Sequence, residues 1–137
     1  MENLKQRLVS FFEENSQSIA EDVERRQNAK NKATIQNLAN QGEKINIPGV
    51  SFHLSFLVEA IKMEDESLFT DYIKWAKLLL REHNISEEVI KHVLNTINEV
   101  IRENLSSELF NESTKYIDSG IQRLKEPVEE LHSYLSF

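Results

Sequence analysis

The chain lacks cysteine altogether and has only three glycines and two prolines among its 137 residues. Without cysteine there can be no disulfide, thiolate metal site or cysteine nucleophile, which is consistent with a cytoplasmic location. Folds made of many tight strand turns use glycine and proline often, so their scarcity favours helices. No apolar run approaches the ~18 residues of a membrane-spanning helix, and the first residues do not have the regions of a signal peptide.

Positive charge is also in short supply. The chain has 23 acidic and 16 basic residues, giving a net charge of −7. Nucleic acids and anionic membrane surfaces bind through basic patches, so we expect neither as a partner. The hydrophobic fraction of 39% is ordinary for a folded chain, and this length fits one domain. We therefore predict a single soluble domain over residues 1–137.

Apolar residues recur at helical spacing and predict an all-α fold, a bundle of five to seven helices. Residues 1–41 are predicted to form peripheral N-terminal helices, a short one followed by a second capped by Ser16 or Ser18. A loop is predicted around Pro48, which lacks a backbone N–H, and Gly49. Residues 50–137 are predicted to form the core bundle.

Two helices are expected at the centre of this bundle. Apolar residues cover most of the circumference of Val50–Met63, so we expect that helix to be buried on several sides. Asp65 is placed to cap the next helix, whose aromatic stripe of Phe69, Tyr72 and Trp75 we expect in the core. Its basic residues are expected to face solvent: Lys74, Lys77 and Arg81.

Serine residues predict where two further helices start. Ser86 precedes Glu87 and Glu88, which would lie in a first turn where the helix dipole favours anions. Ser106 or Ser107 is expected to begin the following helix.

The C-terminal part carries a stripe with the ~3.5-residue period of a coiled-coil seam. We predict that it is an interface with a second copy or with the helices of a partner protein. Pro127 interrupts it, so we expect two helices that meet at Glu126, with one kinked helix as the alternative. The interface candidates are Ile117, Ile121, Leu124, Val128, Leu131 and Leu135.

Motifs that carry out chemistry are missing. There is no glycine-rich phosphate loop, no Gly-x-Ser-x-Gly turn and no carboxylate pair that stands out from the acidic background. Glu129 and His132 have a di-iron spacing, but such a site needs two copies of this motif. We therefore predict no catalytic residues, no metal ligands and no enzyme activity.

His53 is unusual because its neighbours are apolar. A buried imidazole needs a hydrogen-bond partner or loses its charge. One interpretation is a core histidine bonded to a backbone carbonyl or a hydroxyl. The other is a pocket residue, including an axial ligand to haem, and the sequence leaves the cofactor unknown.

Three stretches resemble a helical region that precedes the cobalamin-binding module in bacterial regulatory proteins. They read Phe52-His-Leu-Ser-Phe-Leu-Val-Glu-Ala-Ile61, Leu68-Phe-Thr-Asp-Tyr-Ile-Lys-Trp75 and Leu79-Leu-Arg-Glu-His83. The resemblance implies a sensory or regulatory domain in which His53, Tyr72 and Trp75 correspond to family features, making them the candidate ligand-binding residues. The Asp-x-His-x-x-Gly signature of the cobalamin module is absent, so cobalamin binding is not expected.

These observations predict a signal-input or regulatory domain that binds a small ligand or transmits a signal through helix contacts. The first alternative is a dimerisation or protein-interaction module without a ligand, and the second is a sensor that carries haem or a metal. An enclosed cavity lined by His53 and Trp75 would favour small-ligand sensing, whereas a fully packed core around them would favour the interaction module.

Overall fold

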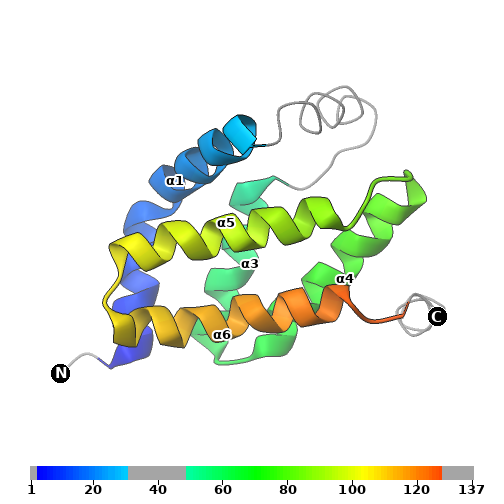
Figure 1. Ribbon diagram of the computed structural model, residues 1–137. Helices are drawn as coiled ribbons and strands as arrows, with labels where there is room; N and C mark the ends of the chain where they lie inside the picture. Colours follow the sequence, from blue (N-terminus) through cyan, green and yellow to red (C-terminus); the bar gives the residue numbers. More distant parts are fainter. Residues whose placement is uncertain (1–2, 31–48, 128–137) are drawn as a thin grey trace.

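The computed structural model describes residues 3–30 and 49–127. Within these ranges the chain forms five α-helices and no strand, and helix covers 87% of the residues, so the predicted all-α bundle is confirmed. The helices are α1 (Leu4–Lys30), α3 (Val50–Met63), α4 (Glu66–Glu82), α5 (Glu88–Asn104) and α6 (Ser107–Leu124), as labelled in Figure 1.

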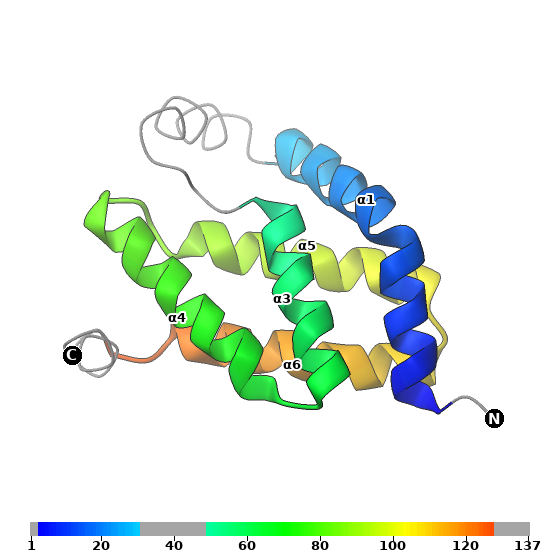
Figure 2. The ribbon, with the colours of Figure 1, turned by 180° about the vertical axis from the view of Figure 1, so that it is seen from behind.

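The helices form two layers. In one layer α5 and α6 run antiparallel, and in the other α1, α3 and α4 lie across them (Figure 1). Helix α3 lies between α1 and α4 and contacts both as well as α6 (Figure 2). Apolar side chains from all five helices form one continuous core between the layers.

Helix α1 differs from the sequence prediction in two ways. It is one continuous helix rather than a short helix followed by a second one. The Ser16 hydroxyl donates to the carbonyl of Phe12 within this helix and does not cap a new one. Leu8, Phe12 and Val23 are fully buried, so this part of residues 1–41 belongs to the core and is not peripheral.

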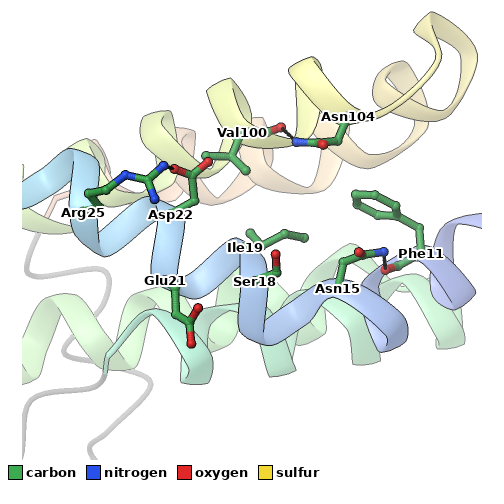
Figure 3. A pocket seen from close by; sticks show the side chains of 9 residues that line it. All are labelled: Phe11, Asn15, Ser18, Ile19, Glu21, Asp22, Arg25, Val100 and Asn104. Atoms are coloured by element: carbon green, nitrogen blue, oxygen red, sulfur yellow. Dashed lines mark hydrogen bonds and ion pairs between the residues drawn. The ribbon is translucent and has the colours of Figure 1, made fainter.

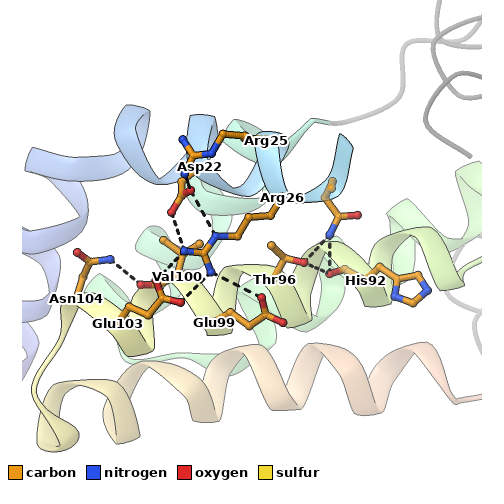
Figure 4. Close-up of polar contacts among 10 residues, drawn as sticks. Asp22, Arg25, Arg26, His92, Thr96, Glu99, Val100, Glu103 and Asn104 are labelled. Carbon is orange, nitrogen blue, oxygen red and sulfur yellow. Dashed lines mark hydrogen bonds and ion pairs between the residues drawn. The ribbon is translucent and has the colours of Figure 1, made fainter. Parts of the chain in front are cut away.

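Polar contacts fix α1 against α5. The guanidinium of Arg26 donates two hydrogen bonds to the Glu103 carboxylate, at 2.9 and 2.6 Å, and lies 3.2 Å from Asp22 (Figure 4). The Gln27 amide donates to the Thr96 hydroxyl at 2.5 Å. Exposed ion pairs contribute little stability, so the Arg26 contacts chiefly set the orientation of α1 on α5.

Two predicted helix starts are confirmed by their caps. Asp65 accepts a hydrogen bond from the Ser67 amide at 3.0 Å at the start of α4, and Ser106 accepts one from the Leu109 amide at 3.3 Å at the start of α6. Helix α5 starts one residue later than predicted, with Glu87 at the N-cap position, although the Ser86 hydroxyl still accepts a bond from the Glu88 amide at 3.1 Å. Each cap satisfies a backbone donor that the first helical turn leaves unpaired.

Two lysines of α4 are buried, and the prediction that they face solvent is wrong. The amine of Lys77 donates to the carbonyls of Leu124 and Glu126 and forms an ion pair with Glu87, while Lys74 lies 3.6 Å from a carboxylate of its own helix. These partners compensate for the burial of charge. Arg81 is exposed, as predicted.

The C-terminal stripe packs mainly inward where the structure describes it. Ile117 and Leu124 are buried in the bundle core, and Ile121 is partly buried against it, so the bundle itself covers this half of the proposed seam. Helix α6 ends at Leu124, ahead of Pro127, as a helix break there requires. The remaining interface candidates lie outside the described residues: Val128, Leu131 and Leu135.

Gly120 allows α6 to approach α4 closely. A methyl group at this position would lie 2.6 Å from a ring carbon of Phe69, which is itself fully buried, and 3.3 Å from a side-chain carbon of Ile73. The glycine is therefore needed for space rather than for its backbone freedom.

We expect Gly120→Ala to lower the free energy of unfolding by up to about 2 kcal/mol, because overpacking costs ~1–3 kcal/mol and the gain in helix propensity offsets only ~1 kcal/mol of it. Urea unfolding followed by circular dichroism measures this change. Asp118→Ala, an exposed change on the same helix, is the control and should have an effect within about 0.5 kcal/mol. A stabilised Gly120→Ala variant would contradict the close approach.

Candidate functional site

An apolar groove runs along the surface between α3 and α4. Phe52 and Phe56 stand one turn apart on α3 and remain 59% and 39% exposed, and Trp75 on α4 remains 47% exposed. The volume of the groove is about 460 Å³. We call this surface the aromatic groove, and its lining residues are Phe52, Phe56, Leu68, Asp71, Tyr72 and Trp75.

The exposure of these side chains corrects one expectation, because Trp75 was expected to lie in the core. Helix α3 is buried on several sides, as expected. Helices α1, α4 and α6 do cover α3, but they leave one stripe of it open, which carries Phe52, Phe56 and Met63. Contiguous apolar surface of this kind marks binding sites more often than isolated exposed residues do.

His53 lies beneath the groove, in the core. Its ring is 4% exposed and its Nδ1 atom is 2.5 Å from the hydroxyl oxygen of Tyr72. Burial lowers the pKa of His53 to about 4, so the imidazole is neutral near pH 7. The interpretation of a core histidine bonded to a hydroxyl is confirmed.

Tyr72 connects this buried hydrogen bond to the groove. Its ring stacks on Phe56 with centroids 4.2 Å apart and an interplanar angle of 10°, and lies 6.1 Å from the ring of Trp75. Burial raises the pKa of the Tyr72 phenol, so it stays protonated and can share its proton with His53. The ring is therefore held from below by the core while its edge lines the groove.

The three predicted ligand-binding candidates lie together but take different positions. Tyr72 and Trp75 line the groove, whereas His53 is behind it and is not among the lining residues. Sequence reasoning missed Phe52 and Phe56 as surface residues. Phe52 and Phe56 are one helical turn apart and therefore share a face, as do the Leu, Tyr and Trp of α4, and this pairing of two apolar faces could have indicated a groove.

Asp71 is the only charged side chain that lines the aromatic groove. It is 65% exposed, and one of its carboxylate oxygens is 3.6 Å from the amine of Lys74, which is buried. The groove therefore combines aromatic surface with one accessible carboxylate.

A second hollow, between α1 and α5, is polar and has a volume of about 290 Å³ (Figure 3). Asn15 donates to the carbonyl of Phe11 at 2.8 Å, and Asn104 donates to that of Val100 at 2.7 Å. These amides bond within their own helices and do not converge on a common point, as the side chains of a ligand site do.

In residues 3–30 and 49–127, no group of three or more His, Cys, Asp or Glu side chains is placed to hold a metal ion. The Glu129 and His132 motif lies outside these ranges. None of the helices in the part of the chain that the structure describes has the length and apolar character needed to cross a membrane.

Comparison with known proteins gives no functional parallel. No family model matches the chain, and no curated protein or solved structure is significantly similar to it. The resemblance to the region that precedes cobalamin-binding modules therefore stays a prediction from the sequence.

Proposed function

We propose that this chain is a cytoplasmic regulatory module that transmits a signal through helix contacts, with the aromatic groove as its contact surface. The observation that carries the proposal is the joint exposure of Phe52, Phe56 and Trp75 on helices whose other faces are well packed. Leaving one large apolar side chain in water forgoes about 1.5–3 kcal/mol. Aromatic residues that are exposed together commonly supply most of the energy of a protein interface.

Helix contacts fit this geometry better than an enclosed small-ligand site does. His53 is packed and hydrogen-bonded in the core, and Trp75 lies in an open groove rather than in a cavity shared with it. A groove between two helices, with aromatic side chains along its walls, is the shape into which an amphipathic helix fits.

A small ligand and a haem group fit the geometry to different degrees. The groove volume of about 460 Å³ lies within the ~300–1,000 Å³ of small-molecule sites, so an apolar small ligand is the second candidate. A haem sensor receives no support from the geometry. His53 is 4% exposed, so the ring would have to leave the core to reach an iron atom.

A selection from displayed random peptides tests the proposal, with the wild-type chain as bait and the Trp75→Ser variant for counter-selection. We expect the enriched peptides to carry apolar residues at helical i, i+4 and i+7 spacing. Their affinity should fall at least about tenfold in Trp75→Ser, because a central aromatic residue is a typical hot spot. Met63→Ser, an exposed apolar change outside the lining residues, is the matched control and should bind as the wild type does.

Trp75→Ser should lower the free energy of unfolding by about 1–2 kcal/mol, since half of the side chain is buried, and a urea titration checks that the variant stays folded. Suppose that the selection yields no groove-dependent peptide while a fragment screen yields small molecules that Trp75→Ser no longer binds. The groove is then a small-ligand site and the proposal is wrong.

A further inference from the structure

We infer that the occupant of the aromatic groove is an amphipathic helix of a partner protein whose apolar stripe is flanked by arginine or lysine. This inference rests on the proposed function and specifies the chemistry of the partner. Asp71 is the one charged side chain in the lining of the groove, and it is 65% exposed although it lies against apolar neighbours.

Exposed carboxylates stand beside the groove on both of its helices. Helical spacing places the exposed Glu59 one turn beyond Phe56 on the open stripe of α3, so α3 and α4 each present a carboxylate beside the aromatic side chains. The two nearby lysines are each paired within the chain. Lys74 is buried and its amine is 3.6 Å from the Asp71 carboxylate, which stays 65% exposed, and the amine of Lys62 is 3.2 Å from the carboxylate of Glu13 on α1.

Asp71 and Trp75 together form a surface suited to a cation. They are four residues apart on α4 and therefore lie on the same face, one turn from each other. An arginine side chain can pair with a carboxylate through two parallel hydrogen bonds and can stack on an aromatic ring. A basic residue in the partner would compensate Asp71 as docking removes water from it.

A second copy of this chain fits the groove less well. Its net charge is −7, and pairing two copies through their grooves would bring two sets of Asp71 and Glu59 carboxylates into one apolar contact. Like charges that face each other across an interface oppose association. The same carboxylates select for a basic helix and increase its rate of association.

Trp75 is the only tryptophan in the chain, so its fluorescence reports directly on the groove. The probes are two tryptophan-free peptides of about 18 residues, or five helical turns. Both carry leucine at i, i+4 and i+7, and the stripe is flanked by arginine in one peptide and by glutamate in the other. We expect the arginine peptide to shift the Trp75 emission to the blue and to bind at least about tenfold more tightly.

Asp71→Asn should remove most of this preference, and raised salt should weaken it because the charges are partly exposed. Asp118→Asn makes the same change on an exposed part of α6 and should leave the preference unchanged. Equal binding of both peptides, with no effect of Asp71→Asn, would overturn the inference while the proposed function stands.

The remaining outcomes separate the inference from the proposed function. If neither peptide binds and the selection yields no groove-dependent binder, helix binding itself is wrong. If the wild type sediments as a dimer that Trp75→Ser converts to a monomer, the occupant is a second copy and the inference falls.

Discussion

Replacement of Lys77 by methionine is expected to lower the free energy of unfolding by about 2–4 kcal/mol. The Lys77 side chain is 4% exposed, and its amine donates to the carbonyl oxygens of Leu124 and Glu126 at 2.5 and 2.8 Å. Methionine has a similar volume, so the change removes the polar contacts and largely preserves the packing. A buried carbonyl left without a donor costs ~1–3 kcal/mol, and two carbonyls lose theirs here.

The ion pair with Glu87, at 2.9 Å, adds to this loss: the Glu87 side chain is 39% exposed as a whole, but the oxygen that faces the amine is buried and would lose its partner. Urea unfolding measures the change, and Lys62→Met is the matched control. Lys62 is 42% exposed and pairs with Glu13, so its loss should cost at most about 1 kcal/mol. Equal small effects of both substitutions would show that the Lys77 amine does not hold the end of α6 in place.

The fold class could be predicted because most of its determinants are local. Caps such as Asp65 and Ser106 act within a few residues of themselves, so their sequence context is enough to place a helix start. Ser16 shows the limit of this reasoning, since the same hydroxyl can cap a helix or bond to a carbonyl one turn earlier. Whether Ser16 caps a new helix or lies inside a continuous one depends on whether the apolar face of α1 packs against other helices along its whole length.

The burial of Lys77 could not be predicted in the same way. Its spacing on α4 is compatible with a solvent-facing position, and the carbonyl groups that accept its hydrogen bonds are 47 and 49 residues further along the chain. Such a partner appears only once α6 has been placed against α4. Spacing within one helix says which residues share a face, but not which neighbour will cover that face.

Only the α4 side of the aromatic groove could be predicted, because spacing within one helix does not show which faces the neighbouring helices leave open. Tyr72 and Trp75 were expected to share a face, and the structure places their rings 6.1 Å apart. The exposure of Phe52 and Phe56 was not expected, because apolar residues all round a helix normally indicate burial on all sides. Among the described helices, none covers the stripe of α3 that carries Phe52 and Phe56. The sequence of α3 does not show which of its faces lacks a packing partner.

His53 provides the second large effect, a loss of stability at acidic pH. The pKa of this group is about 4 in the folded chain, where burial disfavours its charge, against 6.5 for an exposed histidine. Above pH 6.5 both states are neutral at this site and His53 has no effect. Between pH 6.5 and 4 the unfolded chain binds a proton that the folded chain does not, so the free energy of unfolding falls by up to about 3 kcal/mol.

Carboxylates also titrate in this range, so the contribution of His53 must be isolated by difference. His53→Asn keeps a polar group near the Tyr72 hydroxyl but cannot be protonated, and we expect it to be less stable than the wild type at pH 7. As the pH falls to 4, the gap in unfolding free energy between the two proteins should change by about 3 kcal/mol in favour of the variant. The exposed His92, changed to asparagine, is the control for loss of an imidazole from the surface. Parallel curves for His53→Asn and the wild type would mean that the folded chain admits a proton to the His53 imidazole. The hydrogen bond beneath the groove would then not hold the Tyr72 ring as the structure indicates.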